Sequence, residues 1–398
     1  MIISAPAAFS SDAFALSGII GADALIIPKK TPLVKVETVF EQRIIASYYM
    51  KAVHPAQASF SIRSGLLFSP NSDMIQTNSQ EKPRCFSRQE EARSMKLLIL
   101  GGSGFVSGRL AQIAIAQGHE VWCVTRGNRP VPEDVHALTC DAHDPAALRA
   151  ALASAQLQWD AALDCICRDA PSASVDLSVL PAFTNRLLVI STDSVYHPAY
   201  KRVPQDETGV YLHDGGYGSS KRQMEEVFLD AAAHSESPFA WTIFRPGHIF
   251  GAGSQVGCFP EHSRQPDLIA RMKRGEPLRL VGGGKFLIHP IYVDDLCRVL
   301  LESIPVSTAF NEIFCIGGPD IVSNAAYYLL LGEILNVPVT IEEIPLAGYL
   351  EAHPQFSGHL CHRAYSLEKL RRTGIALPGT PLRAGLQKQV EWLLSLAR

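Results

Sequence analysis

The strongest structural signal in the chain is KLLILGGSGFVSGRLAQIAIAQGHEVWCVTR, residues 96–126. A continuous apolar run at 97–100 ends abruptly at glycines, which is typical of a buried strand. A stretch with helical periodicity follows and ends at Gly118, and a second apolar run occupies 121–124. Strand, glycine turn, helix and strand form a βαβ unit, whose turn is where a dinucleotide pyrophosphate meets the N-terminus of the first helix.

The glycine turn departs from the usual spacing at one position. Gly101 permits a tight reversal of the backbone, and Gly104 leaves room for a phosphate to approach main-chain N–H groups. The third glycine of G-x-x-G-x-x-G would fall at Ser107, whose side chain is small enough for close packing of the helix on the strand. A βαβ crossover without a ligand is the alternative. The cofactor contacts predicted in this turn are Gly101, Gly102, Ser103, Gly104, Phe105 and Val106.

Composition excludes several classes of protein. The chain has 398 residues, 47% of them hydrophobic, which is enough for a sizeable core and more than one minimal domain. A net charge of −3 with interspersed signs argues against nucleic acid as the main partner. Nine cysteines without Cys-x-x-Cys pairs, and no His/Cys cluster of metal-site spacing, predict reduced thiols in a cytoplasmic protein without a metal. No apolar run approaches the ~20 residues of a membrane helix.

Residues 1–94 differ in character from the rest. Their first part lacks a basic residue before Lys29 and carries Asp12 and Asp23, which is a poor match to a secretory signal. Residues 71–94 are polar and charged, as in a linker. We therefore expect 1–94 to be a poorly ordered or loosely attached extension, or Met95 to be the natural start.

Two side chains after the next strands bear on the cofactor. Arg126 follows the second strand, where NAD-preferring sites usually have an acid for the ribose 2′-OH, so it could meet a 2′-phosphate and favours NADP. A solvated arginine in a turn is the alternative. Asp141 ends a third strand at 137–140 and is placed to contact an adenine edge, or alternatively caps the helix that begins near Pro145.

Acid–base chemistry is suggested further along. A fifth strand at 186–191 runs into Thr192, and the later Tyr217 and Lys221 share one face of a helix. A phenol with a pKa of about 10 is a poor catalyst at neutral pH. An adjacent ammonium and a cationic nicotinamide would lower that pKa. Thr192 could then hold the substrate hydroxyl whose proton Tyr217 takes; two unrelated surface residues are the alternative.

Five motifs in order, GGSGFVSG, ISTDSVY, YGSSK, FRPGHIFG and HPIYVDD, resemble the NAD-dependent epimerase/dehydratase family, the extended or atypical short-chain dehydrogenase/reductases. The resemblance covers roughly Met95 to the C-terminus. It implies an α/β fold, a doubly wound Rossmann-type parallel sheet with a smaller C-terminal α+β substrate domain. Residues 95–250 would bind NAD(P), and 251–398 would mainly bind substrate, with segments returning to the Rossmann core. The roles implied are acid–base for Tyr217, nicotinamide ribose for Lys221 and substrate hydroxyl for Thr192.

Two departures from the family pattern concern the substrate. Sugar-nucleotide dehydratases of the family have Thr-Asp-Glu at the strand end, whereas this chain has Thr192, Asp193 and Ser194, so a full dehydratase is not expected. The Asn that usually lies near the substrate diphosphate is replaced by His248, which disfavours an ordinary UDP- or dTDP-sugar. Asp193, Ser194 and His248 are candidate substrate contacts, and His248 could equally be a loop histidine with internal partners.

Two structural expectations complete the C-terminal part. The glycines between 278–281 and 286–288 predict a hairpin turn. One of Asp294 and Asp295 is expected to cap the helix that follows them.

The sequence thus predicts an NAD(P)-dependent oxidoreductase or epimerase, favouring NADP, that acts on a hydroxyl of a sugar, nucleotide sugar or similar polar small molecule. No nucleic-acid or membrane partner is expected, and a homodimer is one assembly the sequence allows. The alternative is a binding protein that senses NAD(P), or a relative of the chloroplast stem-loop-binding proteins that uses the fold on RNA. The mildly acidic composition disfavours RNA, and the intact Tyr/Lys pair disfavours a sensor.

Overall fold

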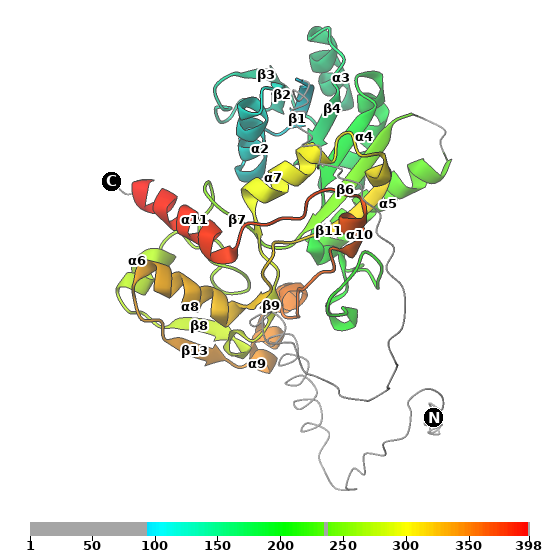
Figure 1. The fold of residues 1–398 in the computed structure, drawn as a ribbon. Helices are drawn as coiled ribbons and strands as arrows, with labels where there is room; N and C mark the ends of the chain where they lie inside the picture. Colours follow the sequence, from blue (N-terminus) through cyan, green and yellow to red (C-terminus); the bar gives the residue numbers. More distant parts are fainter. Residues whose placement is uncertain (1–93, 235–237, 397–398) are drawn as a thin grey trace, which may run out of the picture. The chain divides into compact units, whose positions relative to one another are not determined.

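The computed structural model describes residues 94–234 and 238–396. Within them, seven parallel strands form one sheet in the order β11-β6-β5-β4-β1-β2-β3 (Figure 1). The chain runs outward from β1 through β2 to β3 and returns to the other side of β1 at β4, so the strand order reverses there. Open α/β sheets bind ligands at such a switch point. The predicted doubly wound Rossmann-type sheet is confirmed. Its strands are β1 (Lys96–Leu100), β2 (Glu120–Thr125), β3 (Val135–Thr139), β4 (Ala161–Asp164), β5 (Arg186–Ile190), β6 (Ala240–Pro246) and β11 (Glu312–Ile316).

The central strands are apolar on both faces because helices cover both faces of the sheet. Leu97 and Ile99 of β1 point into one buried cluster, and Leu98 and Leu100 point into the other. The helices of the first cluster are α2 (Phe105–Ala116), α7 (Val293–Glu302) and α10 (Glu368–Arg372), and those of the second are α3 (Pro145–Ser154), α4 (Ala170–Val179) and α5 (Tyr217–His234).

A smaller part of the chain has its own apolar cluster. Tyr327, Tyr328 and Leu331 of one helix pack there with Leu386 of another. β8 pairs in parallel with β13, and β9 pairs antiparallel with β12. The elements of this part are α6 (Leu268–Lys273), β8 (Leu278–Val281), β9 (Leu287–Ile288), β12 (Val322–Ser323), α8 (Asn324–Leu335), β13 (Ile341–Ile344) and α11 (Leu382–Leu396) (Figure 1).

The hairpin predicted from the glycines at 282–284 is wrong. β8 and β9 each pair with a later segment instead of with each other. The three glycines all have positive φ and form a tight turn that lies on the start of α8. A Cβ on Gly284 would come within 2.9 Å of the main-chain nitrogen of Ala325. The glycines therefore allow close packing on a helix and do not join two paired strands.

The prediction that an aspartate caps α7 is also wrong. The N-cap is Tyr292, and both aspartates lie in the first helical turn. Asp294 binds the guanidinium of Arg109 on α2 through hydrogen bonds of 2.6 and 2.8 Å. The Asp295 carboxylate accepts a 3.0 Å hydrogen bond from the main-chain N–H of Gly379. These acids bind α7 to neighbouring segments, and their negative charges also interact favourably with the positive, N-terminal end of the helix dipole.

Short elements connect these parts. None of the described helices combines the length and the apolar character needed to cross a membrane. The expectation for residues 1–94 lies outside the described residues, apart from Ser94. The remaining elements are β7 (Ile249–Phe250), which pairs with β10 (Ile291–Tyr292), α9 (Leu346–Ala352), η1 (Leu180–Ala182), η2 (Asp193–Val195), η3 (Pro198–Tyr200), η4 (Gly282–Gly284), η5 (Ser307–Ala309) and η6 (Pro354–His359).

Candidate active site

The loop between β1 and α2 has the geometry of an anion cradle. Gly101 and Gly102 have φ of +117° and +105°, which L side chains rarely adopt. A Cβ on Gly102 would lie 2.5 Å from the Sγ of Cys123. Gly104 is the N-cap of α2, and its N–H donates to the buried Ser107 hydroxyl at 3.1 Å. The first helical turn carries no acidic side chain, so its N–H groups are available to a phosphate.

This loop also borders a cavity of about 360 Å³ next to the carboxyl ends of β2 and β3. Arg126 and Asp141 both line it, so the structure brings these two predicted cofactor contacts to one cavity. The Asp141 carboxylate accepts from the His143 N–H at 3.0 Å, and this bond lowers the pKa of Asp141. The N-cap of α3 is Asp144, so the alternative role of Asp141 as that cap is wrong. The complete lining is Gly101, Ser103, Gly104, Ser107, Val124, Thr125, Arg126, Arg129, Cys140, Asp141, Ala142, His143, Ile166 and Arg168.

A larger cavity of about 600 Å³ lies on the α2 side of the same loop. Phe105, Arg109 and Trp392 are among the residues that line it. Neither of these two cavities is lined by Tyr217, so size does not identify the chemical centre here. The acid–base residues have to be located from their own contacts.

Tyr217 and Thr192 meet at the carboxyl end of β5. Tyr217 is the first residue of α5 and is 62% exposed, whereas Thr192 is buried. Any side chain at Gly218 would overlap the carbonyl of Ser194, so this glycine lets the first turn of α5 approach the strand end. Desolvation raises the pKa of Tyr217, and the nearby Thr192 hydroxyl and the charge of Arg264 oppose that rise.

Lys221 lies one helical turn after Tyr217 but is only 5% exposed. Its ammonium donates to the carbonyls of Cys167, at 2.5 Å, and Ile190, at 2.7 Å. Burial lowers the pKa of Lys221, and neighbouring acidic groups, among them Asp164, oppose that effect. The structure thus places the ammonium on main-chain carbonyls at the ends of β4 and β5.

Asp193 is bound by two side chains that the sequence did not reveal. Arg363 forms an ion pair with it at 3.0 Å, and the Tyr365 hydroxyl donates to the same oxygen at 2.8 Å. Burial is the largest single effect and opposes the charge of Asp193, but Arg363, Lys201 and the Tyr365 hydroxyl together outweigh it, so the pKa of Asp193 is lowered. Ser194 donates weakly to the other oxygen, at 3.4 Å. Both predicted substrate contacts are therefore engaged with neighbouring protein groups.

His248 is a buried, uncharged side chain beside this cluster. Only 8% of the residue is exposed, and burial lowers the pKa of His248 to about 3. Its ring lies edge-on to Tyr327 with 6.0 Å between centroids. Arg264 and Arg363 are close enough to disfavour its protonation further. At neutral pH, His248 can therefore contact a ligand only as a neutral imidazole.

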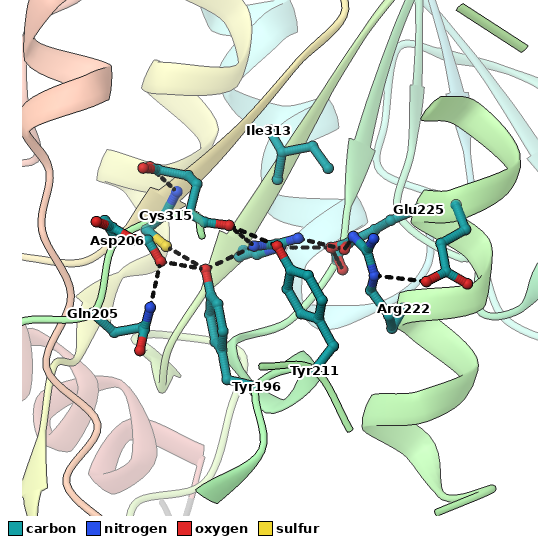
Figure 2. A network of polar contacts seen from close by, with 12 residues as sticks. Tyr196, Gln205, Asp206, Tyr211, Arg222, Glu225, Ile313 and Cys315 are labelled. Atoms are coloured by element: carbon teal, nitrogen blue, oxygen red, sulfur yellow. Dashed lines mark hydrogen bonds and ion pairs between the residues drawn. The ribbon is translucent and has the colours of Figure 1, made fainter. Parts of the chain in front are cut away.

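The helix that carries Tyr217 and Lys221 is anchored by a buried polar network (Figure 2). Glu225, fully buried on α5, accepts from Arg245 of β6 at 2.6 and 2.8 Å and from Ser191 at 2.7 Å. Arg245 also donates to the Tyr196 hydroxyl at 2.7 Å, and its guanidinium lies over the rings of Tyr196 and Tyr211. The motifs FRPGHIFG and ISTDSVY include Arg245, Ser191 and Tyr196, but they do not reveal the pairing with Glu225, which lies on another element. The network fixes α5 on the ends of β5 and β6.

The cradle geometry leads to a test at Gly102. Replacing Gly102 with alanine should weaken dinucleotide binding at least about tenfold. An alanine is strained at this positive φ, and its Cβ would collide with the side chain of Cys123, so we expect the loop to move. Titration of reduced-nicotinamide fluorescence would measure the affinity. Gly118→Ala is the matched control, since its φ is +84° but nothing lies within 4 Å of the added Cβ. Equal affinities of both variants would show that the loop does not hold the cofactor.

Comparison with known protein families gives a match over much of the described chain. The model of the NAD dependent epimerase/dehydratase family matches residues 97–317. This range includes the glycine loop, Thr192, Tyr217 and Lys221.

Characterised relatives are similar at low identity. A 2′-dehydrokanamycin reductase of Streptomyces kanamyceticus is 27% identical over 221 residues, which are 53% of this chain and 58% of the reductase, so less than two thirds of that relative is spanned. The dTDP-glucose 4,6-dehydratase 1 of Escherichia coli (strain K12) is 25% identical over 76% of this chain and 93% of its own length. The chloroplast stem-loop binding protein of 41 kDa b of Arabidopsis thaliana is 21% identical over 69% and 73%.

Solved structures share the fold. The UDP-glucose 4-epimerase of Thermotoga maritima, solved with UDP-glucose, superposes with a TM-score of 0.63 at 19% identity, covering 76% of this chain and all of that one. The UDP-glucose 4-epimerase of Thermus thermophilus, solved with NAD, superposes with a TM-score of 0.60 at 16% identity, covering 75% and 99%.

Proposed function

Because the chain belongs to the NAD dependent epimerase/dehydratase family, we propose that it is an NAD(P)-dependent oxidoreductase or epimerase acting on a hydroxyl of a sugar or a similar polar small molecule. The observation that carries this proposal is the position of the exposed Tyr217 phenol near Thr192 at the strand end, with the buried Lys221 one turn away. These groups lie at the end of β5, beside the switch point of the sheet.

The residues present fit a bound nicotinamide dinucleotide. The N–H groups at the start of α2 would hold its pyrophosphate, and Lys221 would hold the nicotinamide ribose. When bound, the dinucleotide supplies a hydride acceptor at its nicotinamide ring. Tyr217 would accept the proton of a substrate hydroxyl oriented by Thr192. Since desolvation raises the pKa of Tyr217, the phenol needs a neighbouring positive charge to ionise near neutral pH.

A reductase or epimerase is favoured over a dehydratase. The strand-end motif offers Ser194 where a dehydratase has a glutamate, and Asp193 is held by Arg363 and Tyr365. Asp193 therefore lacks the freedom of a general acid. The names of the relatives support a sugar-like substrate, since they include an aminoglycoside reductase and a nucleotide-sugar dehydratase. The proposal includes a cytoplasmic location, a homodimer as one assembly, and a mainly substrate-binding role for residues 251–398.

The direct test of the function uses the purified full chain. Mass spectrometry of small molecules released on denaturation should identify NAD(H) or NADP(H). Absorbance of the reduced nicotinamide, followed with a panel of sugars and nucleotide sugars, should then show hydride transfer. Calorimetry that detects no uptake of either dinucleotide would refute the proposal.

NADP preference is the part of the proposal that depends on Arg126. Replacing Arg126 with alanine should weaken NADP binding by about ten- to a hundredfold and leave NAD binding nearly unchanged, because one charge-assisted contact to the 2′-phosphate is worth about 1.5–3 kcal/mol. Parallel calorimetric titrations with both dinucleotides measure this. Arg149→Ala, at an arginine bound to the Ser178 carbonyl outside the cavity, is the control. Parallel losses for NAD and NADP would show that Arg126 does not read the phosphate.

The resemblance to an RNA-related chloroplast protein supports a second candidate, binding of RNA on the same fold. RNA binding should weaken steeply as salt rises, because phosphate contacts release counterions. A filter-binding titration over salt, run beside the hydride-transfer assay, separates the two. The net charge of −3 favours the enzyme.

A further inference from the structure

The main chain that holds Lys221 is itself held by two buried acids. The N–H of Cys167 donates to the carboxylate of Asp164 at 2.8 Å, while its carbonyl accepts from the Lys221 ammonium at 2.5 Å. The Cys167 thiol lies close to the carboxyl group of Asp176 on α4. One atom each of Asp164, Cys167 and Asp176 lies within 4.8 Å of the others. A single residue thus links the ammonium to both acids.

These two acids cannot both be ionised. Asp164 and Asp176 are 3% and 2% exposed, and a carboxylate oxygen of one lies within 4.8 Å of a carboxylate oxygen of the other. Two adjacent buried charges of like sign are costly, and protonation of one acid relieves their repulsion. We therefore expect one of the two carboxyl groups to hold a proton, which leaves the pair a single negative charge.

The surroundings place the charge on Asp164. One of its oxygens accepts from the N–H groups of Ile166, at 2.5 Å, and Cys167, at 2.8 Å, which stabilise an anion. Among the described residues, no donor reaches the Oδ2 of Asp176, as expected of an oxygen that can itself carry the proton. Burial raises the pKa of Asp176 well above its usual range.

Lys221 needs this charge because its other acidic neighbour is already paired. The groups that face its ammonium are Asp164, Cys165 and Cys167 after or within β4, and Glu225 on its own helix. Glu225 is bound by Arg245 and Arg222. Burial raises the pKa of both thiols, so they stay neutral.

We propose that Asp164 and Asp176 share one proton and act as a monoanionic positioning pair, which fixes the Cys167 carbonyl under Lys221 and keeps the ammonium charged. This inference rests on the proposed function, since it gives Lys221 a role at the cofactor. The pair would not contact cofactor or substrate itself. A divalent cation on Asp164, Asp176 and the Cys167 thiol is the competing explanation of the cluster, and the nearby ammonium opposes it.

The first test is independent of turnover. Infrared spectra of the purified full chain at neutral pH should contain the C=O stretch of a protonated, buried carboxyl group. Difference spectra should show its loss in Asp164→Asn and in Asp176→Asn, because either substitution leaves one carboxylate with an amide donor. Persistence of the band in both variants, or its absence from the parent, would overturn the proposal. A stoichiometric divalent cation found by elemental mass spectrometry would do so too.

The second test uses the pH dependence of hydride transfer. Each single variant keeps one negative charge, so the alkaline limb of its pH–rate profile should match that of the parent. The double variant has none, which lowers the pKa of Lys221 and should move the alkaline limb about one pH unit lower. At pH values above both limbs, turnover should fall about tenfold in the double variant alone, a non-additive result.

A carboxylate outside the pair provides the matched control. Asp160→Asn changes a carboxylate just before β4, where it accepts from the Lys96 N–H, and should alter neither readout. An unmoved limb in the double variant, or a single variant shifted as far as the double one, would overturn the proposal. If the parent itself shows no hydride transfer, the proposed function fails, and the infrared result still decides whether the two acids share a proton.

Discussion

Tyr217→Phe is expected to lower kcat by about 10²–10⁴-fold, the usual contribution of a general acid–base group. The substitution removes one oxygen from a ring at the start of α5, and it leaves Lys221 on its two carbonyls and the glycine loop untouched. Dinucleotide affinity should therefore stay close to that of the parent. Initial rates of nicotinamide reduction give kcat, and a fluorescence titration of the bound reduced cofactor gives the affinity.

A second exposed tyrosine provides the control. Tyr200 is 64% exposed, against 62% for Tyr217, and lies in η3. Tyr200→Phe should leave kcat and cofactor affinity nearly unchanged. Retained turnover in Tyr217→Phe would remove this phenol from the chemistry. Loss of cofactor binding together with turnover would instead assign the phenol a binding role.

The glycine loop and the elements around it were predictable because their signals are local. The glycines, the apolar runs on either side and the helix periodicity all lie within residues 96–126, and each dictates a neighbouring segment. The structure accordingly has β1, α2 and β2 in that order, and Arg126 and Asp141 line one cavity. The parallel order of the sheet follows from repeated crossovers of the same kind.

The contacts around Asp193 were not predictable in the same way. Asp193 is held by Arg363 and Tyr365, which come about 170 residues later, and sequence spacing carries no record of such contacts. The same limit explains the wrong hairpin, since β8 pairs with β13 across a separation that turn residues cannot encode. The pairing of Asp294 with Arg109 is a third instance.

The contacts of Lys221 refine the expectation drawn from its spacing. A position four residues after Tyr217 predicts a shared helical face, but not how deep each side chain lies. Tyr217 is exposed at the first turn, whereas Lys221 enters the core, where the carbonyls of Cys167 and Ile190 satisfy it. In this structure, desolvation raises the pKa of the Tyr217 phenol. The predicted lowering of that pKa would therefore require the positive charge of a nicotinamide cofactor.

Glu225→Gln is expected to lower the free energy of unfolding by about 3–5 kcal/mol, because it leaves the guanidinium of Arg245 buried without its counterion. Arg245 is 1% exposed and makes two of its hydrogen bonds to this carboxylate (Figure 2). Urea unfolding followed by circular dichroism measures the loss, with an unchanged slope as the sign that the same transition is compared. Activity should fall as well, since α5 carries both Tyr217 and Lys221.

Glu226, the neighbouring acid on the same helix, serves to separate the effect of burial on stability from the effect of charge. Glu226 pairs with Arg222 at 3.0 Å but is about half exposed, so Glu226→Gln should cost only about 0–1 kcal/mol. Replacing both Glu225 and Arg245 with leucine and methionine should recover part of the stability lost in the single variant, because no unpaired charge then remains in the core. Equal costs at Glu225 and Glu226 would mean that water reaches the network, and that α5 is held in place by its apolar face and not by this ion pair.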